Sequence, residues 1–269
     1  MPASPLNVVE RLADGLAIVR LNRPDRLNAL SQEAVSALTA TLDEIARDDS
    51  LRVVILTGEG RGFCAGWDLK SKLQGEDGGE SGVSGLYGGQ ERFAGMIRRL
   101  REMGKVVIAA VNGVAVGAGL GLALAADIRL AARSASFHIG AIRIGLTAGE
   151  CGISYHLPRL VGASRAFELM LTGRPVDAEE AARIGLVSAV ADDASLIERA
   201  RSMAGDILRN SPYSVRQTKR LMWANLEAPS LDAAIELENR AQVLALLTDD
   251  FAEASAAFAE KRPPRFTGR

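Results

Sequence analysis

The segment AVNGVAVGAGLGLALAAD, residues 110–127, carries most of the information about the fold of this 269-residue chain. An apolar run that begins at Val106 leads into it and is typical of a buried strand. Asn112-Gly113 predicts a turn, and a second group of glycines then precedes a Leu-Ala pattern typical of a helix. Glycines let a ligand approach the backbone, and the first N–H groups of a helix have no partner within it. The segment therefore predicts a strand–turn–helix unit that holds either a phosphate or a developing oxyanion.

A second turn of small residues, RGFCAGWDL at 61–69, follows another predicted strand, Val53–Leu56. Taken alone, it is equally well explained as a tight loop with a packed Phe and Trp. Taken with residues 117–119, it gives two loops that follow two strands of one core. Two backbone N–H donors that converge on one oxygen from separate loops are what an oxyanion hole requires.

Composition excludes several classes of function. The chain is 48% hydrophobic and 24% charged, as in soluble globular proteins, and its formal net charge of −1 does not favour binding to nucleic acid or to an anionic membrane. Two cysteines, Cys64 and Cys151, are too few for a disulfide framework or a zinc cluster. No apolar run reaches membrane length, and the N-terminus does not resemble a secretory signal. These features predict a cytoplasmic protein without a metal and without membrane insertion.

Strand and helix patterns alternate in the first part of the chain, and almost wholly helical patterns follow residue 160. Ser31 is expected to cap a helix whose apolar face starts at Val35. The stretch 75–89 contains seven glycines and almost no apolar side chains, which predicts a mobile loop. The pattern as a whole predicts an α/β core with a C-terminal helical region.

Two other catalytic motifs are incomplete. Residues 117–122, GAGLGL, place the third glycine one position too early for a dinucleotide-binding fingerprint, and no phosphate-loop lysine follows. Ser154 lies in GISYH, which lacks the final glycine of a serine-hydrolase elbow and is better explained as the start of a helix. A nicotinamide dehydrogenase is therefore the weakest of the candidate enzymes.

With these segments in view, the chain resembles the crotonase (enoyl-CoA hydratase/isomerase) superfamily along nearly its whole length. The matching blocks are LNRP (21–24), LNAL (27–30), FCAGWDL (63–69), residues 110–127, LPRLVG (157–162), LTGR (171–174), AARIGLV (181–187) and AFAEKR (257–262) with Pro264 and Phe266. The resemblance implies an α/β crotonase-type spiral of ββα units over residues 1–200. It implies a C-terminal helical trimerisation region over residues 201–269, and self-association as a trimer or hexamer.

The resemblance also implies an acyl-CoA thioester as substrate, with no further cofactor. The thioester oxygen would lie between the backbone N–H groups of Trp67 and Ala118, the positions that match the family's oxyanion hole. Asp68 is counted with the CoA-binding positions, although a carboxylate in such a turn more often holds the loop by accepting backbone N–H bonds. The other positions matching CoA contacts are Asp25, Arg26, Leu27, Ala29 and Ala65, with Phe258 and Lys261 reaching the ligand of a neighbouring subunit.

The sequence departs from the family pattern at both glutamates that hydratases use to place a water molecule. Gly121 and Ala141 stand at those positions, and neither can transfer a proton. Glu150 lies in a segment, GECGISYHLP, that resembles the one in which enoyl-CoA isomerases place a single catalytic glutamate. The alternative is that Glu150 only caps the helix that follows.

One carboxylate is enough to move a proton between the α and γ carbons of an enoyl thioester. The leading interpretation is therefore an enzyme that converts 3-enoyl-CoA to 2-enoyl-CoA in fatty-acid or related acyl-CoA metabolism, with Glu150 as acid and base. Hydration of 2-enoyl-CoA is one alternative. Binding of acyl-CoA without turnover is the other.

Overall fold

Two sheets form the centre of the computed structural model, which describes residues 4–73 and 82–269. In the six-stranded sheet, of order β1-β2-β3-β5-β7-β10, β1 is antiparallel to β2 and the other neighbours are parallel. Its strands are β1 (Asn7–Arg11), β2 (Leu16–Leu21), β3 (Val53–Gly58), β5 (Val106–Val111), β7 (Ile128–Ala132) and β10 (Ala189–Ala191). The four-stranded sheet contains β4 (Gly62–Cys64), β6 (Val114–Val116), β8 (Ser136–His138) and β9 (Val176–Asp177).

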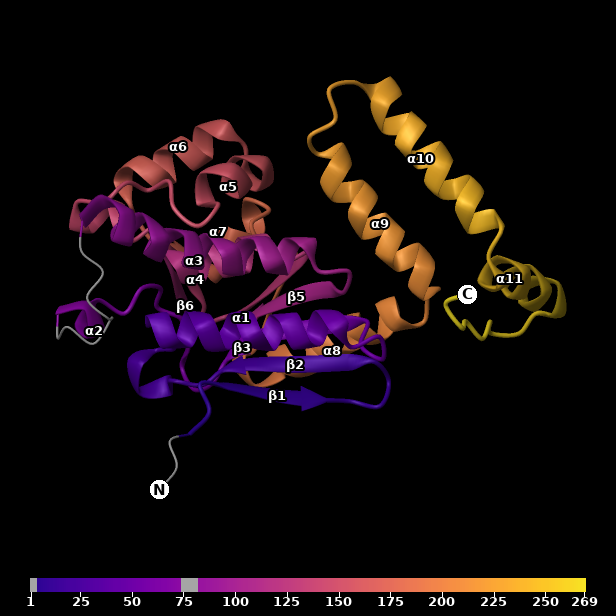
Figure 1. The fold of residues 1–269 in the computed structure, drawn as a ribbon, viewed down its shortest axis with the longest axis horizontal. Helices are drawn as coiled ribbons and strands as arrows, with labels where there is room; N and C mark the ends of the chain where they lie inside the picture. The colour runs from indigo at the N-terminus through magenta and orange to yellow at the C-terminus, as the bar shows by residue number, and fades with distance from the viewer. Residues whose placement is uncertain (1–3, 74–81) are drawn as a thin grey trace.

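Helices cover the sheets and make up the C-terminal part of the chain (Figure 1). Three are short 3₁₀ helices: η1 (Pro24–Arg26), η2 (Ala141–Ile144) and η3 (Asp193–Ser195). The α-helices up to α6 are α1 (Gln32–Arg47), α2 (Leu69–Leu73), α3 (Gly82–Glu102), α4 (Ala118–Ala125), α5 (Ile153–Val161) and α6 (Ala163–Thr172). They are followed by α7 (Ala178–Arg183), α8 (Leu196–Leu208), α9 (Pro212–Asn225), α10 (Leu231–Leu246) and α11 (Asp249–Glu260).

The strands and helices repeat as ββα units, which confirms the predicted spiral. Strands β3, β5 and β7 are successive neighbours in the large sheet, and each is followed by one short strand of the small sheet, β4, β6 or β8. Every residue of β3 and β5 is buried, as expected for parallel strands covered on both faces. The turn between each short strand and its helix therefore lies at one edge of the small sheet, where residues from separate repeats can meet.

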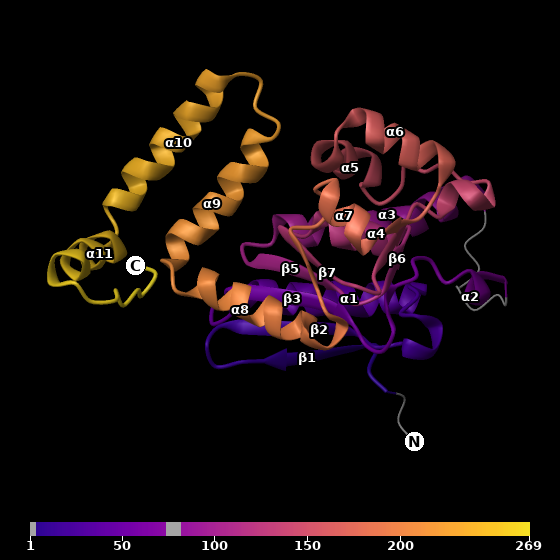
Figure 2. The same cartoon turned by 180° about the vertical axis from the view of Figure 1, so that it is seen from behind.

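The helices on the two faces of the large sheet follow the apolar patterns of the sequence. Ser31 caps α1 by accepting a hydrogen bond from the N–H of Ala34, as predicted, and α1 packs against α3 (Figure 1). Helix α8 lies across the other face, against β3, β5 and β7 (Figure 2). Ala200 and Ala204 of α8 are buried in this contact, so the boundary proposed at residue 200 falls within a helix of the core.

Two expectations from the sequence were wrong. Residues 82–89 are not a loop but the first turns of α3. They extend toward the N-terminus the helix whose apolar face, from Phe93 onwards, packs on α1. The rest of the predicted loop, at 75–81, lies outside the described residues. The chain after residue 160 also contains β9 and β10, which pair with β8 and β7. Strands of two or three residues are too short to show a period of two in the sequence.

The C-terminal arm, defined here as residues 212–269, extends away from the sheets (Figure 1). Asp250, which is buried, fixes its end to its beginning: the carboxylate accepts hydrogen bonds from the Ser211 hydroxyl at 2.7 Å and from the N–H of Thr267 at 2.7 Å. Helix α10 contributes no buried residue to the described chain. Its exposed apolar side chains are Leu231, Ile235, Leu237, Val243, Leu244 and Leu246.

Candidate active site

A cavity of about 240 Å³ lies at the ends of α3, α4 and the loop before α5. It brings together Trp67 and Ala118, which were predicted to bind the thioester oxygen, and Glu150, which was predicted to move the proton. Sequence reasoning did not assign the rest of the lining. Phe93 could have been found from its place on the apolar face of α3, but the other residues carry no such signal. They are Gln32, Leu86, Gly89, Gln90, Leu146 and Cys151.

The glycine turn before α4 presents the backbone to this cavity. Gly117 has φ +51°, and its N–H donates to the carbonyl of His138 at 3.1 Å. Ala118 is the first residue of α4, so no carbonyl of the helix can accept its N–H. A Cβ at Gly119 would lie 2.2 Å from the carbonyl oxygen of Cys64, so the close approach of α4 to β4 requires glycine there.

The second turn meets the first one. A Cβ at Gly66, which has φ +80°, would lie 2.5 Å from the carbonyl oxygen of Val116 and 3.4 Å from the nitrogen of Ala118. Leu30 fixes the turn at Gly66 and Trp67, because its N–H donates to the carbonyl of Gly66 at 2.7 Å. Segments more than fifty residues apart in the sequence thus place their backbones side by side.

Asp68 is a buried residue of the turn after β4 and is bound by other protein groups. Its buried carboxylate accepts the Ser71 N–H at 3.2 Å and forms an ion pair with Arg23 at 2.8 Å. Burial alone would raise the pKa of Asp68, but the hydrogen bonds from Ser71 and Arg23 keep it below the ordinary value. Both carboxylate oxygens are engaged by the protein, which is the arrangement of a residue that holds a loop.

Glu150 is half-buried, and its carboxylate lies against the glycine turn. A Cβ at Gly117 would be 2.9 Å from Oε1 of Glu150, so the side chain has room there only because residue 117 is glycine. Burial raises the pKa of Glu150 above its usual value. A carboxylate of raised pKa in a cavity, beside a helix N-terminus, is suited to accept and return a proton.

The alternative that Glu150 caps α5 is wrong. The N-cap position of α5 is occupied by Gly152, and no side chain accepts a hydrogen bond there. Glu150 contributes only its backbone carbonyl, which accepts the N–H of Ile153 at 2.8 Å. The side chain lines the cavity, with its Oε1 against Gly117.

The space beside Gly121 is filled by the main chain. A Cβ at Gly121 would lie 2.7 Å from the carbonyl oxygen of Cys151 and 2.8 Å from its Cβ. Cys151 itself has φ +46°, a left-handed conformation that is unfavourable for a residue with a side chain. Burial raises the pKa of the Cys151 thiol to about 12, so it is a neutral neighbour of Glu150 at physiological pH.

The positions assigned to CoA fall into two groups. Residues 25–29 follow β2 and contact the turn after β4, where the N–H of Ala65 donates to the carbonyl of Leu27 at 2.9 Å. Phe258 and Lys261 lie in and just after α11, in the C-terminal arm, and do not line the cavity of their own chain. Phe258 is 88% exposed.

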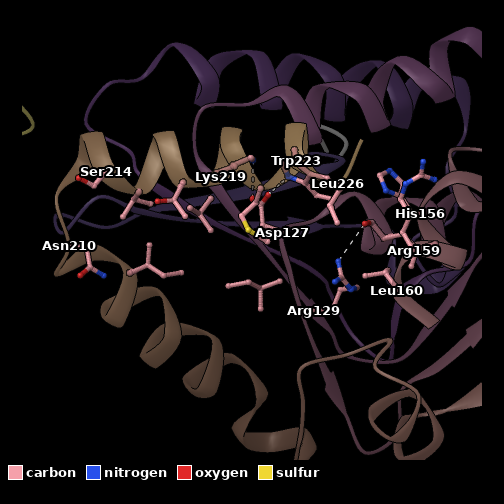
Figure 3. Close-up of a pocket in the computed structure, with 17 residues that line it drawn as sticks. Asp127, Arg129, His156, Arg159, Leu160, Asn210, Ser214, Lys219, Trp223 and Leu226 are labelled. Carbon is pink, nitrogen blue, oxygen red and sulfur yellow. Dashed lines mark hydrogen bonds and ion pairs between the residues drawn. The ribbon is translucent and has the colours of Figure 1, made fainter. Parts of the chain in front are cut away.

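A larger cavity, of about 750 Å³, lies between α9 and the core (Figure 3). It contains none of the residues predicted for the reaction. Two of its charged side chains compensate each other, because Asp127 forms an ion pair with Lys219 at 2.9 Å, and Asp127 also accepts the indole N–H of Trp223 at 2.7 Å. The smaller cavity is therefore the candidate active site.

Two structural features are absent from residues 4–73 and 82–269. No helix in these ranges combines the length and apolar character needed to cross a membrane. No group of three or more His, Cys, Asp and Glu side chains in them is arranged to hold a metal ion.

The whole chain is similar to known proteins of one family. The family model for enoyl-CoA hydratase/isomerase matches residues 11–269. The probable enoyl-CoA hydratase EchA12 of Mycobacterium tuberculosis is 45% identical over 269 residues, which cover 97% of this chain and 93% of that protein. The crystal structure of a probable enoyl-CoA hydratase/isomerase from Mycobacterium abscessus superposes with a TM-score of 0.90 at 42% identity, covering 98% of this chain and 99% of that one. A monofunctional enoyl CoA isomerase from M. smegmatis, also 42% identical, has a TM-score of 0.73 over 86% of this chain and 99% of its own.

Proposed function

Because this chain belongs to the enoyl-CoA hydratase/isomerase family, we propose that it is the isomerase type of acyl-CoA enzyme, which moves a double bond from the 3 to the 2 position of an enoyl-CoA. The observation that carries the proposal is the single carboxylate of Glu150 beside the glycine turn of α4. The isomerase among its relatives in solved structures supports the same reaction.

In this mechanism the backbone stabilises an enolate. The thioester oxygen accepts hydrogen bonds from the N–H groups of Trp67 and Ala118, whose turns lie side by side. Negative charge develops on that oxygen when a proton leaves C2, and each well-placed donor in such a site is worth about 2.7–4 kcal/mol. The CoA portion is expected to lie along residues 25–29, Ala65 and the turn containing Asp68.

Glu150 carries the proton. Its carboxylate removes a proton from C2 of the 3-enoyl thioester, which gives a dienolate that extends over C1 to C4. The same carboxyl group returns the proton at C4, so the double bond ends between C2 and C3 and the enzyme is unchanged. No second acid or base is required.

The rate is expected to fall on the acid side because only ionised Glu150 can accept the proton. Burial raises the pKa of Glu150 in the free protein, so the midpoint of this fall in kcat/KM should lie above pH 4.5, the ordinary value for a glutamate. Initial rates of isomerisation measured between pH 4 and 9 give the midpoint. A midpoint at or below 4.5, or a rate that does not change with pH, would contradict the assignment.

Hydration is the second candidate, and the names of relatives such as EchA12 favour it. Here Glu150 would have to place the water molecule and transfer its proton alone, since Gly121 and Ala141 provide no carboxylate. Binding of acyl-CoA without turnover is the third candidate, because Gly121 and Ala141 cannot transfer a proton.

Offering the purified protein a 3-enoyl-CoA and, separately, a 2-enoyl-CoA distinguishes the three functions. Conversion of the first substrate to a 2-enoyl-CoA that Glu150→Gln abolishes supports isomerisation. Rapid formation of 3-hydroxyacyl-CoA that survives in Glu150→Gln refutes the role of Glu150. Tight binding of both thioesters with no turnover indicates a carrier protein.

We also propose that the C-terminal arm drives self-association as a trimer or hexamer. Helix α10 exposes six large apolar side chains, a pattern typical of an interface. Light scattering is expected to give a mass three or six times the chain's 28.5 kDa, and Leu244→Glu should reduce it. Phe167→Glu, which changes an exposed apolar residue of α6 instead, serves as the comparison. A monomer at micromolar concentration would contradict this proposal.

A further inference from the structure

The turn that holds Glu150 in the cavity is conformationally unfavourable. Cys151 and Gly152 are both left-handed, with φ +46° and +76°, and Cys151 is not a glycine. Such a conformation persists only where the surrounding structure maintains it. On one side, α4 supports the turn: Gly121 packs directly against Cys151, and a Cβ at position 121 would lie only 2.7 Å from the carbonyl oxygen of Cys151.

His156 supports the turn from the other side. A Cβ at Gly152 would lie 3.2 Å from Cδ2 and 3.5 Å from Nε2 of His156, and the N–H of His156 donates to the Gly152 carbonyl at 2.9 Å. The imidazole is buried and near several arginines, which lowers its pKa to about 4. It is therefore a neutral ring at physiological pH, and its role here is packing.

His156 in turn packs on the C-terminal arm. The ring of Trp223 in α9 stands edge-on to it, with centroids 5.6 Å apart and an angle of 72° between the planes. Trp223 is fixed by its indole N–H, which donates to Asp127, and by the guanidinium of Arg101, 4.6 Å above its ring. Figure 3 shows Trp223, Asp127 and His156 along the wall of the large cavity.

We propose that Trp223 is a positioning residue, which acts through His156 and Gly152 to keep Glu150 beside the glycine turn of α4. The contacts run from Asp127 to Trp223 and then to His156, which packs against the turn at residues 151–152 next to Glu150. The inference rests on the proposed role of Glu150, but the position of that carboxylate can be measured without turnover.

If Trp223 is removed, the turn is expected to relax and Glu150 to become more solvated. Trp223→Ala should then lower kcat by about tenfold to a hundredfold with KM changed less than twofold, because small misplacements of a reacting group have effects of this size. Trp223→Phe keeps an aromatic edge against His156 but loses the bond to Asp127, and should retain much of the rate. Met222→Ala is the matched control, since Met222 is its neighbour in α9 and lines the same cavity but is largely exposed and has no ring to place against His156.

The second measurement is the pKa of Glu150, followed by NMR of the side-chain carboxyl carbon in ¹³C-labelled protein and assigned with Glu150→Gln. Trp223→Ala should move this pKa toward the ordinary glutamate value, and Met222→Ala should leave it raised. If Trp223→Ala fails to fold, Trp223→Leu, which keeps apolar bulk but has no aromatic edge to place against His156, decides by the same two measurements.

An unchanged kcat and an unchanged Glu150 pKa in folded Trp223→Ala, or in Trp223→Leu if the alanine variant does not fold, would overturn the inference. An inactive wild-type protein would instead refute the proposed function, while the pKa measurement would still test the positioning role.

Discussion

Replacing Glu150 with glutamine is expected to lower the rate of double-bond migration by about 10²–10⁴-fold, the range found for loss of a general acid–base group. The amide has the shape of the carboxyl group but cannot accept a proton. Binding of the thioester should change little, because the donors to its carbonyl are backbone N–H groups of α4 and of the turn after β4. Steady-state kinetics with a 3-enoyl-CoA give kcat and KM separately.

The same substitution is expected to stabilise the folded protein at neutral pH. The pKa of Glu150 is raised by burial, so the charged form is less favourable in the folded than in the unfolded state. The two proteins should be equally stable at pH values below the unfolded pKa near 4.5. As the pH rises through the folded pKa, the wild type should become the less stable of the two.

Urea unfolding at pH 4 and pH 8 measures both stabilities. Glu102→Gln, which changes an exposed glutamate of α3, controls for the general effect of losing a negative charge. If Glu150→Gln were less stable at pH 8, the carboxylate would be holding the structure, as a capping residue does. Unchanged isomerisation would remove Glu150 from the mechanism.

The second large effect is expected at Gly121. Adding a methyl group there should destabilise the protein by about 1–3 kcal/mol, because the new atom would meet the backbone of Cys151, which no rotamer change can relieve. Gly95→Ala in α3 is the matched control, since nothing lies within 4 Å of its Cβ position and the substitution should stabilise the helix by about 0.5–1 kcal/mol. Opposite signs of the two changes in urea unfolding would support the packing argument.

Gly121→Glu tests the consequence for function. It introduces a glutamate at the position that the resemblance matches to a hydratase glutamate, but Cys151 occupies the space. We expect this variant to be less stable than Gly121→Ala and to gain no hydration of 2-enoyl-CoA. A stable variant that forms 3-hydroxyacyl-CoA would show that the Gly149–Gly152 segment can move aside.

The absence of a carboxylate at Gly121 was evident from the sequence, but the reason it cannot simply be replaced was not. That reason is a contact with Cys151, thirty residues away, whose left-handed conformation leaves no signature in the sequence pattern. For Glu150, the sequence left capping and catalysis open, and the structure shows no side-chain hydrogen bond capping α5 and a Glu150 that lines the cavity.

The amino-acid sequence by itself determined the family, the ββα spiral and the two turns that meet at the cavity. The two turns and the α/β core follow from local features such as buried strands, caps and glycines, whereas the spiral and the family follow from the ordered blocks that resemble the crotonase superfamily. The tertiary structure alone decided that residues 82–89 are helical, that Asp68 is engaged by Arg23, and that α9 contacts the loop of Glu150 through His156. Each of these depends on packing between segments far apart in the chain, which local propensity does not encode.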